Sequence, residues 1–234
     1  KEAWYSSLFD KCTENQIKGE GSSNYTFFPH RLRTAQHIYE HNPDIKLIYL
    51  VKDPIKRAIT HYYSDYRTAN VNDDVENEIF KNYQFISFSR YYTQLERYLR
   101  YFKKEQIHVV VFEELIKNQN EELNKLSNFL NIKPFTNKLP HSNKYEDYKN
   151  LDRKTLQMVS NPIIKKSIKI IPNKYREFFK NRLEKNANRD DLPEISNFVK
   201  YNLGLCLKLD VLALEKFLNR RIESWRDSFT YESE

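Results

Sequence analysis

The stretch Leu47-Ile-Tyr-Leu-Val-Lys-Asp-Pro-Ile-Lys-Arg-Ala-Ile-Thr-His-Tyr62 decides the fold. Its first five residues are apolar and rich in β-forming types, and a continuous apolar run of this length suits a strand that is covered on both faces. Asp53 and Pro54 follow, which is the pattern of a helix N-cap and a first helical residue. The stretch therefore predicts a buried strand over residues 46–51 that runs directly into a helix over residues 54–66.

The junction between this strand and this helix is typical of an anion-binding site. Ligands of parallel sheets bind outside the carboxyl ends of the strands, and the free N–H groups of a helix start attract phosphate. Lys52 adds a full positive charge, and Lys56, Arg57 and Thr60 can share one helix face. The alternative is a capped helix whose basic residues are simply solvated.

The rest of the chain predicts an α/β protein. A second apolar run, residues 107–112, is flanked by charged residues and reads as another buried strand. Strands and helices alternate, which favours a mostly parallel sheet with a helical C-terminal part. The length fits a single domain over residues 1–234. Apolar spacing and stop signals predict four further helices, at residues 31–41, 89–102, 121–130 and 199–218, with helix and loop after about Pro134.

Composition excludes several classes of protein. The 39 Lys and Arg residues outnumber the 32 Asp and Glu residues, and the net charge of +7 favours an anionic ligand. The three glycines, Gly19, Gly21 and Gly204, cannot form a Walker A loop or a G-x-G-x-x-G fingerprint. Cys12 and Cys206 are the only cysteines, and we expect buried thiols rather than a disulfide scaffold or a zinc site. No apolar stretch approaches the ~18 residues of a membrane span.

The segment from Lys52 to Tyr62 resembles the 3′-phosphate-binding element of sulfotransferases that use 3′-phosphoadenosine 5′-phosphosulfate (PAPS). That element reads roughly L-R-[DN]-P-x-x-R-A-x-S-H-Y. Lys52 stands where the family usually has Arg, and Thr60 stands where it has Ser. Both changes keep a cation and a hydroxyl, although a lysine lacks the bidentate fork of arginine, so we expect a lower affinity. Six residues match outright: Asp53, Pro54, Arg57, Ala58, His61 and Tyr62.

The resemblance extends along the chain in the same order. Residues 19–25 are similar to the family's G-E-K-S-x-x-Y segment, with Gly21 in place of the Lys, and residues 29–46 are similar to the helix and N-P-x-A-K that follow. Residues 89–102, 105–115 and 214–225 resemble three later motifs. The pattern is closer to the heparan-sulfate and bacterial branch than to the cytosolic phenol branch.

This resemblance implies a fold, an activity and a donor. The fold would be a three-layer, P-loop-kinase-like α/β sheet, and the activity would be transfer of a sulfuryl group from PAPS to a hydroxyl or amine of a glycan or other acceptor. PAPS, or its product 3′-phosphoadenosine 5′-phosphate (PAP), would be the bound nucleotide, and no metal is expected. The resemblance assigns Lys52 and Thr60 to the 3′-phosphate and places Arg57 near it, as a further residue that binds the nucleotide. It points more weakly to Ser89 and Tyr91, because their motif closes over the nucleotide.

The family's first motif has no counterpart in this sequence. It is a strand followed by a P-K-x-G-[TS]-[TS] loop that cradles the 5′-phosphosulfate. In the heparan-sulfate branch, a Glu-containing segment after it supplies the general base. We expect the sequence to start after both; the alternatives are a 5′ half supplied from elsewhere and a lost activity. The catalytic base is therefore unassigned. Glu20 is the one acid of a matched motif near the expected cleft, where it would orient the acceptor or serve as a salt-bridged rim carboxylate.

Two other classes of function stay open. One is a non-catalytic remnant that binds a nucleotide or a glycan. The other is a basic nucleic-acid-binding module, in which tyrosines and arginines of residues 90–101 would stack on bases. Helical spacing makes a core face and a solvated face the better interpretation of that stripe, so no nucleic acid partner is expected. The few cysteines favour the cytoplasm, with the Golgi lumen as the alternative compartment.

Overall fold

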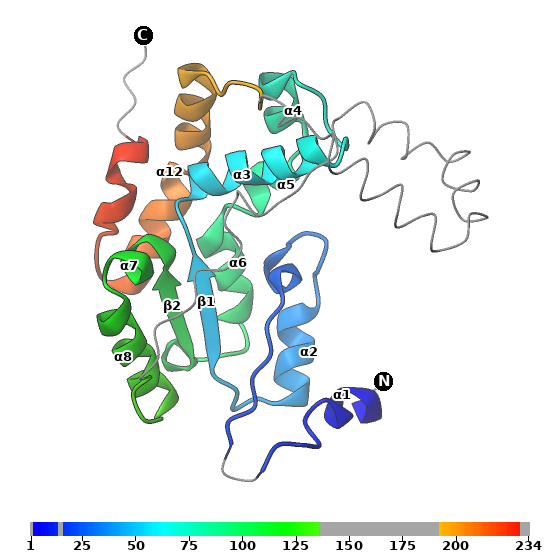
Figure 1. Ribbon diagram of the computed structural model, residues 1–234, viewed down its shortest axis with the longest axis vertical. Coiled ribbons are helices and arrows are strands. Elements are labelled where there is room, and N and C mark those ends of the chain that lie inside the picture. The colour runs from blue at the N-terminus through cyan, green and yellow to red at the C-terminus, as the bar shows by residue number, and fades with distance from the viewer. Residues whose placement is uncertain (1, 14–15, 136–191, 230–234) are drawn as a thin grey trace, which may run out of the picture.

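Two parallel strands form the sheet within the residues that the computed structural model describes, 2–13, 16–135 and 192–229 (Figure 1). Strand β1 (Leu47–Val51) pairs with β2 (Ile107–Val111), and Val51 lies opposite Val111. Both predicted strands are therefore confirmed, and their carboxyl ends meet at one edge of the sheet. The predicted helix and loop after Pro134 lie largely outside the described residues.

The helices follow the predicted order, with differences at their ends. The helix expected at residues 31–41 begins three residues later, and the helix expected at 89–102 ends at Tyr98. Phe112, assigned to a strand from the sequence, instead starts a short helix. The helical elements are α1 (Glu2–Ser7), η1 (Ser23–Thr26), α2 (Thr34–His41), α3 (Pro54–Arg67), α4 (Val75–Lys81), α5 (Gln84–Ser87), α6 (Tyr91–Tyr98), η2 (Lys104–Gln106), α7 (Phe112–Lys117), α8 (Gln119–Leu130), α12 (Asn197–Leu218) and η4 (Glu223–Phe229).

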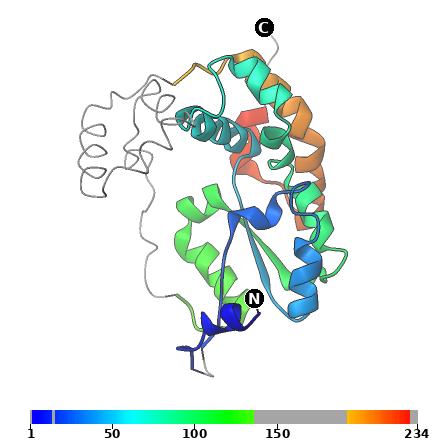
Figure 2. The ribbon, with the colours of Figure 1, turned by 90° about the vertical axis from the view of Figure 1, so that its right-hand side faces the viewer.

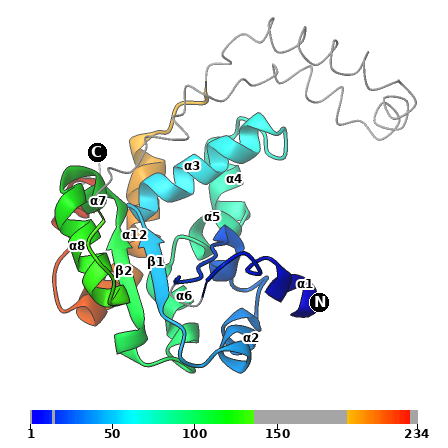
Figure 3. The same ribbon diagram turned by 60° about the horizontal axis from the view of Figure 1, so that its bottom comes forward.

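The sheet lies between two groups of helices, as a three-layer α/β fold requires. Figure 3 shows α2 and α6 on one side of the strands and α7 with α8 on the other. The first side holds the larger core, in which Val51 and Val111 are buried together with Leu95 of α6 and Trp225 of η4. Apolar residues of both strands therefore face the same helices.

The other face of the sheet is covered unevenly. On β2, Val110 is only 4% exposed, and the His108 ring stacks on Phe129 of α8 with 5.0 Å between ring centroids. On β1, Ile48 and Leu50 are 48% and 54% exposed. The prediction that both strands are covered on both faces is therefore wrong for β1 within the described residues, because α8 packs on β2.

A second core joins α3 to the C-terminal helix. Ile55 and Tyr62 of α3 are buried beside Leu203 and Leu207 of α12, which runs past α3, α5 and α6 (Figure 2). Gly204 lies at this contact, where an added Cβ would be 3.7 Å from the Ile55 side chain. Helix α3 is thus fixed at its first turn by α12.

The two cysteines and the helix lengths bear on the predictions from composition. Cys12 and Cys206 are free and half-buried, so the expectation of buried thiols holds only in part. None of the helices in the described ranges combines the length and the apolar character needed to cross a bilayer.

Candidate functional site

The start of α3 is fixed by a buried carboxylate. Asp53 is fully buried, and its Oδ1 accepts hydrogen bonds from the backbone N–H groups of Ile55, at 2.9 Å, and Lys56, at 3.0 Å. Pro54 occupies the first turn, as the sequence predicts. These bonds fix the backbone at the junction between β1 and α3. They therefore also fix the positions from which its side chains project.

Lys52 and Thr60 meet on the surface of α3. The Lys52 ammonium donates to Thr60 Oγ1 at 3.1 Å, and that hydroxyl donates to the carbonyl of Lys56 at 2.6 Å. Burial lowers the pKa of Lys52, and the Glu113 carboxylate opposes that shift. The structure therefore places a cation beside a hydroxyl, the pair that the resemblance assigns to the 3′-phosphate.

Arg57 and Ser89 form a second pair beside the first. Arg57 Nη1 donates to Ser89 Oγ at 3.4 Å, and its guanidinium lies 5.7 Å from the centroid of the Phe88 ring. Ser89 is 1% exposed and donates to the carbonyl of Phe85 at 2.7 Å. Burial lowers the pKa of Arg57, yet an arginine stays charged at neutral pH. The pair adds a fixed positive charge to the junction.

Tyr91 closes the junction from α6. Its hydroxyl accepts a hydrogen bond from the backbone N–H of Lys52 at 3.4 Å, and its ring lies 5.9 Å from that of Tyr49. Burial raises the pKa of Tyr91, so the phenol stays neutral. The five residues that the sequence singles out for the nucleotide are thus brought together by β1, α3, α6 and the turn before α6.

Glu20 is bonded to η1. Its exposed carboxylate accepts a hydrogen bond from the hydroxyl of Tyr25, and this contact raises the pKa of Tyr25 to about 12. Among the contacts of the described residues, Glu20 touches neither Lys52 nor Arg57. Its role toward an acceptor stays a prediction.

Three residues of the junction were missed by sequence reasoning. Glu113 follows β2 and accepts hydrogen bonds from the Asp53 backbone N–H, at 2.9 Å, and from Trp225 Nε1, at 3.0 Å. The Ser228 hydroxyl donates to Asp53 Oδ2. A carboxylate directly after a parallel strand is a signal that points to Glu113. Glu113 and Trp225 also stand in two of the motifs that carry the resemblance, residues 105–115 and 214–225. Ser228 lies outside these motifs, and its partner is distant in the sequence.

The junction has the chemistry of a phosphate site. Two carboxylates, of Asp53 and Glu113, are occupied by N–H and O–H donors, whereas Lys52, Lys56 and Arg57 supply positive charge. Charge-assisted hydrogen bonds from such cations and hydroxyls suit phosphate oxygens. Within the described ranges there is no group of three His, Cys, Asp or Glu side chains that would hold a metal ion.

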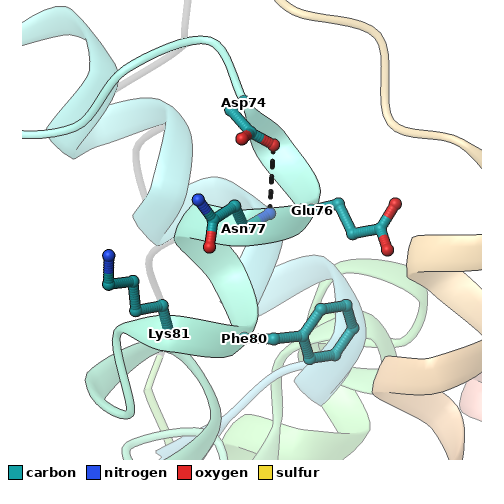
Figure 4. Close-up of a pocket in the computed structure, with 5 residues that line it drawn as sticks. All are labelled: Asp74, Glu76, Asn77, Phe80 and Lys81. Carbon is teal, nitrogen blue, oxygen red and sulfur yellow. Dashed lines mark hydrogen bonds between the residues drawn. The ribbon is translucent and has the colours of Figure 1, made fainter.

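A separate hollow on α4 has a different character (Figure 4). It is lined by Asp74, Glu76, Asn77, Phe80 and Lys81, and Asp74 accepts from the backbone N–H of Asn77 at 3.2 Å. Two carboxylates against one ammonium disfavour an anion, so this hollow is not part of the candidate site.

Comparison with known proteins gives the same assignment. The family model described as "Sulfotransferase domain" matches residues 22–190. The human heparan sulfate glucosamine 3-O-sulfotransferase 5 is 31% identical over 143 residues, which cover 56% of this chain and 40% of that enzyme. The human 3-O-sulfotransferase 3B1 is 32% identical over 143 residues, which cover 56% and 35%. The chain thus spans less than half the length of these relatives.

Solved structures support the same fold. A sulfotransferase from Alicyclobacillus acidocaldarius aligns with a TM-score of 0.61 at 20% identity, over 97% of this chain and 74% of that one. This likeness supports the predicted α/β architecture with its parallel sheet. The family match spans more than half of the sequence and includes the β1–α3 junction. The chain therefore belongs to the PAPS-dependent sulfotransferase family.

Proposed function

We propose that this chain binds PAPS by its 3′-phosphate at the β1–α3 junction and transfers the sulfuryl group to a hydroxyl or amine of a glycan. The observation that carries the proposal is the pairing of Lys52 with Thr60 beside the pairing of Arg57 with Ser89. The Lys52 and Arg57 side chains offer a phosphate positive charge and N–H donors. The exposed Thr60 hydroxyl adds a third donor when it turns from the Lys56 carbonyl to the phosphate.

Each residue has a distinct part in this proposal. The Lys52 ammonium and the Thr60 hydroxyl contact the 3′-phosphate, and Arg57 lies near enough to share its charge. Ser89 holds the Arg57 guanidinium in place. Tyr91 supports the Lys52 backbone and borders the nucleotide.

The reaction makes one bond and breaks one bond at sulfur. The acceptor oxygen or nitrogen bonds to sulfur while the bond from sulfur to the phosphate oxygen breaks, and a general base takes the acceptor proton. Negative charge develops on the leaving phosphate, where fixed cations and N–H groups stabilise it. The junction holds the 3′ end of the donor and so orients the reacting end relative to the acceptor. We keep Glu20 as a residue that orients the acceptor.

The net charge and the named relatives support the proposed acceptor, and the free cysteines support the proposed compartment. The matched relatives are heparan sulfate sulfotransferases by name, and a net charge of +7 suits an acidic glycan. Both cysteines are free, which favours the reducing cytoplasm over the Golgi lumen as the proposed compartment.

The test is a thermal-unfolding titration with PAP and, in parallel, with 5′-AMP. A ligand that binds only the folded chain adds about 2.7 kcal/mol to the free energy of unfolding at 100 times its Kd. We expect stabilisation by PAP but little by AMP. Lys52→Ala should weaken PAP binding about 30-fold, the loss of one charge-assisted contact. Lys81→Ala is the matched control, because Lys81 is exposed and lies on α4, outside the junction.

Other outcomes separate the alternatives. Equal stabilisation by PAP and AMP, or an unchanged Lys52→Ala variant, would contradict the 3′-phosphate site. Binding of PAP without transfer of labelled sulfate from PAPS to heparan sulfate would favour the non-catalytic nucleotide-binding protein. Binding that ignores the 3′-phosphate and weakens steeply with salt would favour a nucleic-acid-binding module.

A further inference from the structure

Glu113 joins the phosphate-facing junction to the C-terminal turn of the chain. We propose that Glu113 is a positioning residue: it locks the β1–α3 junction to η4, so that recognition of the 3′-phosphate depends on Trp225 and Ser228. This inference rests on the proposed function, because it concerns the same site. None of the three residues is expected to touch the nucleotide.

Both oxygens of Glu113 are used, one on each segment. Oε1 accepts from the Asp53 backbone N–H at 2.9 Å, and Oε2 accepts from Trp225 Nε1 at 3.0 Å. The Asp53 N–H belongs to the peptide unit that follows Lys52. A bond at that unit fixes its plane and therefore the direction in which Lys52 leaves the strand.

A second tie runs from η4 to the same residue. The Ser228 hydroxyl donates to Asp53 Oδ2, the carboxylate whose other oxygen caps α3. Trp225 and Ser228 are three residues apart in a 3-10 helix, where such residues share one face. Both are buried, with exposures of 1% and 5%. Helix η4 is therefore bonded to the junction in two ways. Trp225 is linked through Glu113 to the Asp53 backbone, and Ser228 binds the Asp53 side chain directly.

The charge of Glu113 also affects Lys52, through the pKa of its ammonium group. Burial lowers the pKa of Lys52, and Arg57 and Lys56 lower it further, whereas Glu113 and Asp53 raise it. A carboxylate at position 113 therefore raises the pKa of Lys52 against the effect of burial, in addition to orienting the residue.

Glu114 provides a matched control. It follows Glu113 and also binds the C-terminal part of the chain, through two hydrogen bonds from Arg220 at 2.8 and 2.6 Å. Neither of its two bonds reaches Asp53 or Lys52. A purely structural role for carboxylates at this place predicts similar behaviour for the two positions, whereas a positioning role separates them.

The experiment compares Glu113→Gln with Glu114→Gln in the whole chain, by two readouts. The first uses no nucleotide: NMR hydrogen exchange of the Trp225 indole N–H and the Asp53 amide. The second is the ratio of the Kd for AMP to the Kd for PAP. A glutamine has one acceptor oxygen, so its NH₂ group faces one of the two donors. We expect Glu113→Gln to expose at least one of these N–H groups and to lower the ratio about 10-fold. Glu114→Gln should leave both readouts unchanged.

The outcomes distinguish this inference from the proposed function. If the wild type prefers PAP and Lys52→Ala removes the preference, an unchanged ratio in Glu113→Gln overturns the positioning role. Equal loss in the two glutamine variants also overturns it, because the effect would then be general. If the wild type shows no preference for PAP, the proposed function fails and so does the link to the phosphate.

A further variant, Trp225→Phe, removes one donor to Glu113 and keeps the Asp53 bond. Its ratio of the Kd for AMP to the Kd for PAP should lie between those of the wild type and Glu113→Gln.

Discussion

Helices α3 and α7 follow two strands that end in the same register, yet they differ in almost every respect. Helix α3 has 14 residues, a side-chain N-cap and five buried residues. Helix α7 has six residues, no side-chain cap and no buried residue. The first turn of α3 carries Lys56 and Arg57, whereas that of α7 carries Glu113 and Glu114. The helix that follows β1 thus carries positive charge. The helix that follows β2 supplies Glu113, a negative residue that holds the β1–α3 junction in place.

Among the changes considered, removal of the α3 N-cap should destabilise the protein most. Asp53→Ala deletes the acceptor of two backbone N–H groups and leaves the Ser228 hydroxyl without its partner. The cap contributes about 1–2 kcal/mol, and a buried hydroxyl without a partner costs about 1–3 kcal/mol. We expect the free energy of unfolding to fall by about 4 kcal/mol, measured by urea denaturation.

The matched control is an exposed cap of the same residue type. Asp74 caps α4 through a 3.2 Å bond from the Asn77 N–H, with its side chain at the surface. Asp74→Ala should cost about 1 kcal/mol. Similar losses in the two variants would show that burial adds nothing to the cap of α3.

Helix α3 should also respond to acid through His61. Burial and, to a smaller extent, Arg57 lower the pKa of His61 to about 4, against about 6.5 in an unfolded chain. Between these values the unfolded chain binds a proton that the folded chain does not, so stability falls as the pH falls from about 6.5 to 4. The side chain is about one-fifth exposed, which screens the effect, and we expect a loss of about 2 kcal/mol.

His61→Asn tests this contribution because asparagine does not titrate. Urea denaturation at pH 7 and at pH 4.5 should show a smaller pH dependence for the variant than for the wild type. Asp65, which lies 3.9 Å from the imidazole, titrates in both proteins and cancels in the comparison. Identical pH dependence would mean that the folded chain protonates His61 like an exposed imidazole.

A small substitution should strengthen the packing of α3. Gly204 lies inside α12, and an added Cβ would stand 3.7 Å from the Ile55 side chain and 3.9 Å from that of Phe229, which are ordinary contacts. Alanine loses less backbone entropy than glycine when it enters a helix. Gly204→Ala should raise the free energy of unfolding by about 1 kcal/mol, seen as a higher Tm. A lower Tm would show that α12 and α3 already touch too closely.

Local chemistry explains which parts of the fold were predictable. The cap at Asp53 and the turn at Pro54 were predicted because both depend on neighbours in the sequence. The partial exposure of β1 was not predicted, since Ile48 and Leu50 have the same apolar character as the covered residues of β2. Tertiary packing decides which strand a helix covers. An alternating or continuous apolar pattern in the sequence does not predict that choice.

The candidate site divides in the same way. Lys52, Thr60 and Arg57 lie within one continuous segment, so resemblance to a motif was enough to group them. Glu113 is 60 residues from its backbone partner, Asp53, and Ser228 is 175 residues from Asp53. Pairings of this range depend on the assembled fold, which is why the brace was found only in the structure.

The tie between Ser228 and Asp53 also sets an order of events during synthesis. At roughly 5–20 residues per second, the ribosome needs on the order of 10 s to add the residues that separate them. Throughout that interval the nascent chain contains the residues of β1 and α3 but lacks η4, the turn that holds their junction. Chains that end before η4 lack this tie, so their β1–α3 junction should be cleaved more readily in limited proteolysis.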